Sequence, residues 1–218
     1  ESHSIITFAN GFTNNGKILF DSPYYYGVLN VTTGVLTNAA TGIIKTQGNP
    51  VSVGYYQMSA AVNNLGTIDI GYLLYHYTSA GQSHTTGAVN IAAGKEYRIL
   101  SGQWHWDGGT ATGTGLLSFY SSATGSFNTA TMPAVVTYFS NSTLASTLGS
   151  ISNSKKIRIA NNNSITANLN NTDTILVQNQ PNNFTGNFTN TPTSVLWLDG
   201  AESHSIITFA NGFTNNGK

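Results

Sequence analysis

The sequence predicts an all-β chain that winds as a right-handed parallel β-helix (β-solenoid) of about nine coils in each 201-residue period. Three observations lead to this expectation. The start of the chain recurs at its end, a short Asn-centred motif recurs within it, and charged residues make up only 7% of the composition. Coils of roughly 18–26 residues lie in the range of solenoid repeats, each of which packs on its neighbours.

The long repeat defines the domain organisation. Residues 1–17 recur letter for letter as residues 202–218, and the offset is 202 − 1 = 201. No structural constraint requires identity at every surface position, so the match indicates a tandem duplication. We expect residues 1–201 to form one repeat module and residues 202–218 to begin the next. The two copies should share one conformation, and the next module should stack directly on the last coil.

A shorter motif of the form apolar-x-Asn-x-Gly-x-apolar recurs within the period. It runs over Phe12–Ile18 and Val62–Ile68, and Ile151–Ile157 and Leu169–Ile175 carry Lys or Asp at the Gly position. The residues that we expect to form the turns and a ladder are Asn14, Asn38, Asn64, Asn153, Asn171 and Asn190. Their successive positions differ by 24, 26, 89, 18 and 19. The largest of these differences divides into about four coils.

Short alternating segments follow these motifs and predict strands. In Ile157-Arg158-Ile159, period-2 alternation directs both Ile side chains inward and Arg158 outward. Asn and Gly supply the left-handed backbone conformations that turn the chain between strands. Asn side chains on successive coils can bond to one another and to the turn backbone, as in the ladders of stacked parallel strands.

The coil motif and one further segment resemble a known class of proteins. The sequences FTNNGKI, VNNLGTI and ISNSKKI, together with Trp104–Phe119, resemble the Gly/Asn-rich β-helix repeats of large bacterial surface and secreted proteins. Filamentous-haemagglutinin-like adhesins and autotransporter passengers belong to this class. The resemblance implies an extracellular, cell-surface setting in a bacterium. The start of the chain lacks the features of a signal peptide, so we expect it to lie inside a longer precursor.

The composition argues against several function classes. The chain has 8 Lys and Arg, 8 Asp and Glu, and a formal net charge of +0, whereas a nucleic-acid-binding protein needs a basic surface. No apolar run approaches the roughly 18 residues of a transmembrane helix. The chain has no Cys. A solenoid does not need disulfides, because the backbone of each coil bonds to the coils on either side.

We expect no enzyme activity, no cofactor and no metal site. The carboxylates are scattered, without the paired acids that glycan-cleaving β-helices place on neighbouring coils. The one constellation of interest is His105, which lies between two Trp residues and precedes Asp107; His76 and His84 can stack nearby in the coil below. No His-x-x-x-His spacing accompanies it. We therefore interpret His105 as a surface residue among aromatic neighbours.

Aromatic residues crowd the first half of the chain. Exposed rings in register on successive coils would form a row suited to stacking on sugar rings or to packing another filament. Alternatively, the inward rings fill the core and the outward rings stiffen the surface. The candidate surface-binding aromatics are Tyr24, Tyr26, Tyr55, Tyr75, Trp104 and Trp106.

The leading functional hypothesis is a structural repeat module of a long extracellular fibre, stalk or adhesin shaft. Its partner is the next copy of the module, stacked end to end, with lateral bundling or glycan surfaces as further partners. One alternative is a carbohydrate-binding β-helix module that uses the Tyr and Trp rows, and a more distant one is a β-helix glycan-degrading enzyme. The sequence leaves open whether the periods are covalently joined or assemble as a non-covalent filament.

Overall fold

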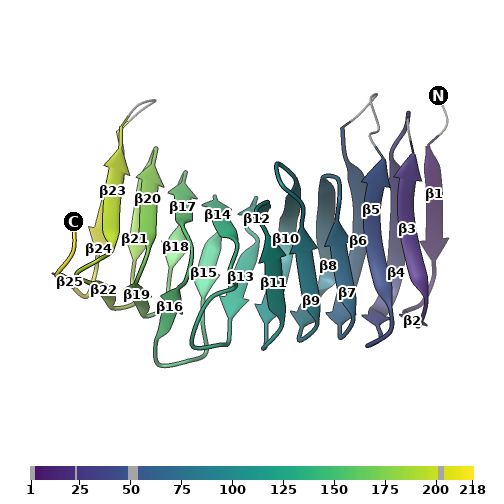
Figure 1. Cartoon of the computed structure of the whole chain (residues 1–218), viewed down its shortest axis with the longest axis horizontal. Coiled ribbons are helices and arrows are strands. Elements are labelled where there is room, and N and C mark those ends of the chain that lie inside the picture. Colours follow the sequence, from purple (N-terminus) through teal and green to yellow (C-terminus); the bar gives the residue numbers. More distant parts are fainter. Residues whose placement is uncertain (1–2, 23, 49–53, 201–203) are drawn as a thin grey trace.

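The computed structural model is a parallel β-solenoid of about 10 turns, and it describes residues 3–22, 24–48, 54–200 and 204–218. The described residues form strands and no helix, which confirms the predicted all-β solenoid. The coils follow one another along the chain, so that β1 (Ser4–Phe8) and β25 (Phe213–Asn215) lie at opposite ends (Figure 1). No helix in the described part is long and apolar enough to cross a membrane.

Each coil contributes up to three strand segments in chain order. The first segments are β1, the first parts of β4 (Gly27–Asn38), β6 (Tyr56–Asn64), β8 (Leu74–Thr85) and β10 (Glu96–Trp106), then β12 (Leu116–Tyr120), β14 (Val136–Ser140), β17 (Ile157–Ala160), β20 (Thr174–Gln178) and β23 (Val195–Asp199). The second segments are β2 (Phe12–Asn14), the second parts of β4, β6, β8 and β10, then β13 (Thr124–Phe127), β15 (Thr143–Ala145), β18 (Ser164–Ile165), β21 (Pro181–Phe184) and β24 (Ile206–Phe209). The third segments are β3 (Lys17–Ser22), β5 (Ile43–Gly48), β7 (Thr67–Ile70), β9 (Ala88–Ile91), β11 (Thr110–Gly113), β16 (Ile151–Asn153), β19 (Leu169–Asn171), β22 (Phe188–Asn190) and β25.

Alternation along these strands builds the core. In β7, Ile68 and Ile70 are fully buried, whereas Asp69 between them faces outward and pairs with Lys45 at 2.8 Å. The strands pair in parallel and in register, so Ile68 lies between Ile44 of the preceding coil and Val89 of the following coil. Full burial of an Ile side chain contributes roughly 1.5–3 kcal/mol. A column of such side chains therefore holds each coil to its neighbours.

A bulge in β10 changes which side chains face the core. The register with β8 shifts between Ile99 and Gln103, where Gly102 takes a φ of 75°. Before the bulge the odd-numbered Ile99 is buried, and after it the even-numbered Trp104 and Trp106 are buried. The bulge thus sets the inward direction of both Trp side chains.

One Asn ladder runs along the corner between the second and third segments. The Nδ2 of Asn14 donates to the Oδ1 of Asn38 at 2.8 Å, Asn38 donates to Asn64 at 2.8 Å, and Asn64 donates to the Oγ1 of Thr85 at 3.0 Å. The other proton of each Nδ2 goes to a backbone carbonyl one coil on, those of Ile43, Thr67 and Ala88. Asn38 and Asn64 are fully buried, so these bonds satisfy amides that have no access to water.

A second Asn ladder lies at a different corner, at the end of the third segment. Its bonds run from Asn153 to Asn171 at 2.9 Å, from Asn171 to Asn190 at 2.7 Å, and from Asn190 to Asn215 at 2.8 Å. The inference of one ladder is therefore wrong, although Asn64 and Asn153 do lie about four coils apart, in the third and seventh coils. The six residues form two ladders at two corners.

The corner between the second and third segments, here called the first corner, carries residues other than Asn beyond Asn64. Register pairs Asn64 with Thr85, Thr85 with Trp106, and Trp106 with Phe127, at equal intervals along the chain. After Phe127, the third segment is reduced to an isolated bridge from Thr131 to Ser152 before β16 resumes it. Asn153 ends this third segment, so it lies at a different corner from Phe127, which ends a second segment.

The repeated residues form the same strands at both ends of the chain. In the last coil, however, each of these strands occupies the next segment position compared with the first coil. Residues 206–209 of β24 are copies of 5–8 in β1, and 213–215 of β25 are copies of β2. In the first coil these are the first and second segments, whereas in the last coil they pair with β21 and β22 as the second and third. One period thus spans nine coils and one segment. The second copy is thus rotated by one segment relative to the first, a rotation that the sequence did not predict.

Substitution of Asn64 by Ala tests the ladder. The change leaves the Nδ2 of buried Asn38 without its Asn64 partner, so we expect the free energy of unfolding to fall by about 1–3 kcal/mol. Denaturant unfolding measures the loss. The matched control is Asn63→Ala, because Asn63 lies beside it in β6 and faces outward. We expect the control to stay within about 0.5 kcal/mol of the parent chain, and equal losses in both variants would argue against the ladder.

Candidate functional site

Three of the predicted surface aromatics form a continuous row on the outside of the first coils. The ring of Tyr26 stacks on that of Tyr55 with a centroid distance of 5.4 Å, and Tyr55 stacks on Tyr75 at 4.2 Å and an interplanar angle of 15°. Tyr24, at 65% exposure, projects from the loop before β4. The stacked rings of the row face one another and are half-buried, and the hydroxyl of Tyr75 accepts from the Nη1 of Arg98 at 3.1 Å.

Trp104 and Trp106 are not surface residues, which corrects the sequence-based assignment. Both are at most 1% exposed. Trp104 packs edge-on against His76 and Tyr97, and the Nε1 of Trp106 donates to the carbonyl of Gly109 at 2.8 Å. The bulge at Gly102 is the physical reason, because it exchanges the inward and outward positions of β10.

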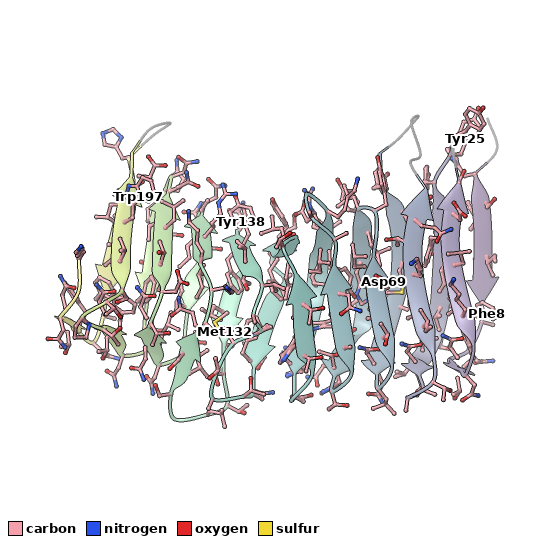
Figure 2. All side chains as sticks on the ribbon, viewed as in Figure 1. Phe8, Tyr25, Asp69, Met132, Tyr138 and Trp197 are labelled. Atoms are coloured by element: carbon pink, nitrogen blue, oxygen red, sulfur yellow. The ribbon has the colours of Figure 1, made fainter. Side chains whose placement is uncertain are left out.

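Arginine side chains extend the row along the solenoid. The guanidinium of Arg98 lies 5.0 Å from the ring centroid of Tyr75 and 4.6 Å from that of Tyr120. Arg158 lies 5.1 Å from the centroid of Tyr138, which stands on the outside of β14 (Figure 2). Each contact between a cation and an aromatic face contributes about 0.5–1 kcal/mol at an exposed site. The row therefore ties the first segments of successive coils together.

Glu96 fixes the position of Arg98 within the row. The Nε and Nη2 of Arg98 donate to the two carboxylate oxygens of Glu96 at 2.9 and 2.6 Å, and Ser118 donates to the same carboxylate. Burial and the nearby Glu96 charge raise the pKa of Tyr120 to about 12. The Tyr120 phenol therefore ionises only at a pH higher than an ordinary Tyr requires.

Several carboxylates face a basic group instead of a second acid. Glu96 pairs with Arg98, Asp69 pairs with Lys45, and Asp107 contacts His84. Glycan cleavage by two acids requires carboxyl groups about 5–9.5 Å apart on either side of the bond. Each of these three acids contacts a basic side chain on the same coil or the coil next to it.

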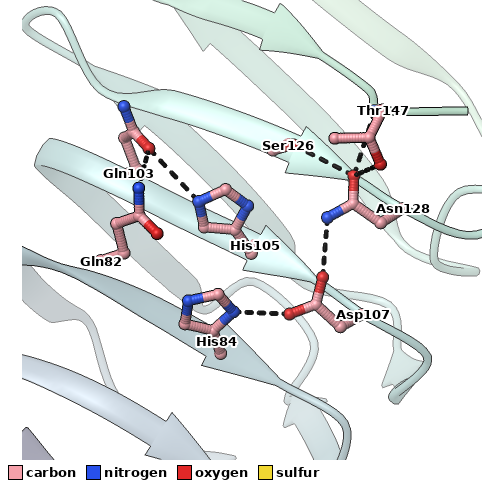
Figure 3. Close-up of polar contacts among 8 residues, drawn as sticks. All are labelled: Gln82, His84, Gln103, His105, Asp107, Ser126, Asn128 and Thr147. Carbon is pink, nitrogen blue, oxygen red and sulfur yellow. Dashed lines mark hydrogen bonds and ion pairs between the residues drawn. The ribbon is translucent and has the colours of Figure 1, made fainter.

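His84, His105 and Asp107 gather on the outside of the first corner (Figure 3). Register pairs His84 of β8 with His105 of β10, and the two rings stack with a centroid distance of 4.7 Å and an angle of 10°. The Nδ1 of His84 lies 2.6 Å from the Oδ2 of Asp107. One ligand atom from each residue lies within 4.8 Å of the others, and these residue types are ligands of transition metals.

Neighbouring amides orient this cluster. The Nδ2 of Asn128 donates to the Oδ1 of Asp107 at 2.7 Å, and the Nε2 of His105 lies 3.3 Å from the Oε1 of Gln103. Burial and the neighbouring His84 lower the pKa of His105. Burial raises the pKa of Asp107, but hydrogen bonds from Asn128 and His84 outweigh it and the net pKa is lowered. These shifts favour a neutral His105 imidazole beside an ionised Asp107 carboxylate.

The length of one coil is the sequence feature that could have predicted this cluster. The interval from His84 to His105 equals the interval from Thr85 to Trp106, which is one coil. Local metal-binding spacings miss the pair, since the two residues meet only when one coil stacks on another. His76 does not join them, because it faces the core.

Comparison with known proteins does not place the chain in a family. No family model, curated protein or solved structure matches it.

His76 is a core residue with both ring nitrogens satisfied. Its Nε2 lies 2.8 Å from the carbonyl of Ala60, to which it donates, and its Nδ1 accepts from the hydroxyl of Tyr97 at 2.7 Å. The ring is fully buried, and burial lowers its pKa to about 4 from 6.5. Burial also raises the pKa of Tyr97, so the pair is neutral at physiological pH.

The depressed pKa of His76 predicts a loss of stability in acid. As the pH falls from 6.5 to about 4, the unfolded chain takes up a proton on His76 that the folded protein does not bind. The stability from this group is complete above pH 6.5, and about 3 kcal/mol is lost across that interval. Denaturant unfolding of the parent chain and of His76→Gln at several pH values measures the difference. An equally steep acid dependence in the variant would contradict this assignment.

Proposed function

We propose that this chain is a structural repeat module of a long extracellular fibre, stalk or adhesin shaft, in which modules stack end to end as one continuous solenoid. The observation that carries the proposal is the Asn ladder at the repeat junction. The mechanism is mechanical, because added modules extend the shaft and stability accumulates coil by coil.

The repeated Asn has both of its ladder partners only when one module follows another. Asn215 is the copy of Asn14, and its Oδ1 accepts the bond from Asn190 Nδ2 at 2.8 Å. At the other end, Asn14 donates to Asn38 at 2.8 Å. Within the described residues, no Asn side chain donates to the Oδ1 of Asn14. A preceding module would supply that donor from its own Asn190.

The rotation by one segment joins the second ladder of one module to the first ladder of the next module. The second ladder of one module ends in Asn215, which stands where the first ladder of the next module begins. Six Asn side chains then bond in succession across the junction, in the order Asn153, Asn171, Asn190, Asn14, Asn38 and Asn64. A junction without the rotation would leave the two ladders at separate corners.

The ends of the solenoid carry apolar surface that stacking would cover. Eight exposed large hydrophobic side chains lie in the first and last coils: Ile5, Ile6, Phe8, Leu19, Trp197, Leu198, Ile206 and Phe213. Phe8 and Trp197 mark the two ends in Figure 2. Apolar patches and unpaired strand edges of this kind favour association. The next copy of the module is the partner whose strands match both ends.

The surface between the ends suits a shaft in an extracellular medium. Only 7% of residues are charged, and the row of Tyr and Arg ties the coils together on the outside. The resemblance of the coil motif to bacterial surface proteins supports a location at the cell surface. Lateral bundling is a further partnership that a surface with little like-charge repulsion allows.

A carbohydrate-binding module is the second candidate. The exposed ring of Tyr24, unlike the rings of the stacked row, has a free face for a sugar. Glycan-array binding that is lost in Tyr24→Ala would favour this function. Binding to no glycan, or binding unchanged in that variant, would leave the structural module as the remaining candidate.

The shaft function predicts a fixed increment of length per period. Nine coils and one segment at about 4.8 Å per coil extend the solenoid by about 45 Å. Small-angle scattering of a chain with one period and a chain with two periods, each followed by residues 202–218, should show this difference in maximum dimension. Two bodies joined flexibly, or a longer chain without a longer rod, would contradict the proposal. The mass of the native polypeptide under denaturing conditions then distinguishes a covalent array from a non-covalent filament.

A further inference from the structure

We infer that His84, His105 and Asp107 bind one zinc ion on the outside of the solenoid, and that the ion links two successive coils. His84 belongs to the fourth coil, whereas His105 and Asp107 belong to the fifth. This inference does not depend on the fibre function, because the site lies within one module.

The donor set matches the preferences of zinc. Two imidazoles and a carboxylate are the ligands of many open zinc sites, in which water takes the fourth position. The Nδ1 of His84 faces the Oδ2 of Asp107 at 2.6 Å, and the ring of His105 lies over that of His84 with a nitrogen on the side of Asp107 (Figure 3). Partial exposure, 43% for the His84 side chain and 28% for Asp107, leaves the site open to solvent and to the ion.

Zinc binding requires only a small movement of the three side chains. Ligands at about 2.0–2.1 Å around a tetrahedral zinc ion lie about 3.4 Å from one another. The three ligand atoms already lie within 4.8 Å of one another. Zinc requires the Nδ1 of His84 and the Oδ2 of Asp107 to separate from 2.6 Å, and a small tilt of the stacked His rings would accommodate the ion. The parallel register of β8 and β10 keeps the Cα atoms of His84 and His105 at the spacing of neighbouring strands.

Outer contacts hold two of the ligands in place. Asn128 donates to Asp107 Oδ1 at 2.7 Å, and the Oδ1 of Asn128 in turn accepts from Ser126 and Thr147. The Nε2 of His105 faces Gln103 Oε1, which leaves its Nδ1 for the metal. Zinc-binding His side chains usually donate their other ring N–H to an oxygen in this way.

The position of the cluster on the solenoid indicates the role of a bound ion. At this corner the inner Asn ladder ends, because Thr85 and Trp106 replace Asn on the two coils that carry the cluster. His84 and His105 immediately precede those residues and face outward. A zinc ion here would link the coils from outside where the amide bonds inside have ended.

Zinc titration by calorimetry, with Co²⁺ as a spectroscopic probe of tetrahedral coordination, tests the inference. We expect one ion per chain, a higher unfolding temperature with zinc, and loss of both effects in His84→Ala and in His105→Ala. Asn128→Ala should weaken binding by about 10- to 100-fold, because it removes only the contact that orients Asp107. The matched control is His204→Ala, an exposed His outside the cluster, which should bind as the parent chain does.

The unfolding transition of each variant without zinc verifies that it is folded. The inference is overturned if the parent chain binds no zinc, or if His84→Ala and His105→Ala bind it as tightly as His204→Ala.

Discussion

The need to satisfy buried amides governs this solenoid. An Asn side chain that faces the core has two N–H donors and a carbonyl acceptor, and water cannot reach them. In each ladder one donor goes to the next Asn and the other to a backbone carbonyl, while the carbonyl receives the preceding Asn. An unsatisfied buried donor or acceptor costs about 1–3 kcal/mol. A ladder is therefore complete only where another coil lies on each side, which makes stacking self-propagating.

This constraint links local sequence to long-range order. Asn in the turns bends the chain, its side chain fixes the register of the next coil, and the register aligns the inward Ile and Val columns. The same register aligns outward residues, so the row of Tyr26, Tyr55 and Tyr75 and the pair of His84 and His105 follow from it. Features on the outside of the molecule are thus consequences of the bonds inside.

Much of the fold was predictable from the sequence because coil formation is a local property. The motif at Phe12–Ile18 predicts its strand, turn and inward residues from adjacent positions alone. The division into two ladders was not predictable, since it depends on whether each Asn ends a second or a third segment, which only the strand pairing shows. The burial of Trp104 and Trp106 was missed for a similar reason, because the bulge at Gly102 reverses the alternation that the sequence suggests. The cluster at Asp107 needed the local coil length, which only the register of β8 and β10 defines.

The central claim is that the repeat continues the same solenoid with a rotation of one segment per period. Electron cryomicroscopy of a chain with three consecutive periods tests it most directly. We expect unbroken coils across both junctions, with the stacked row of Tyr26, Tyr55 and Tyr75 displaced by about a third of a turn from one module to the next. Gaps between modules, or rows on the same side of the shaft in all three modules, would contradict the account.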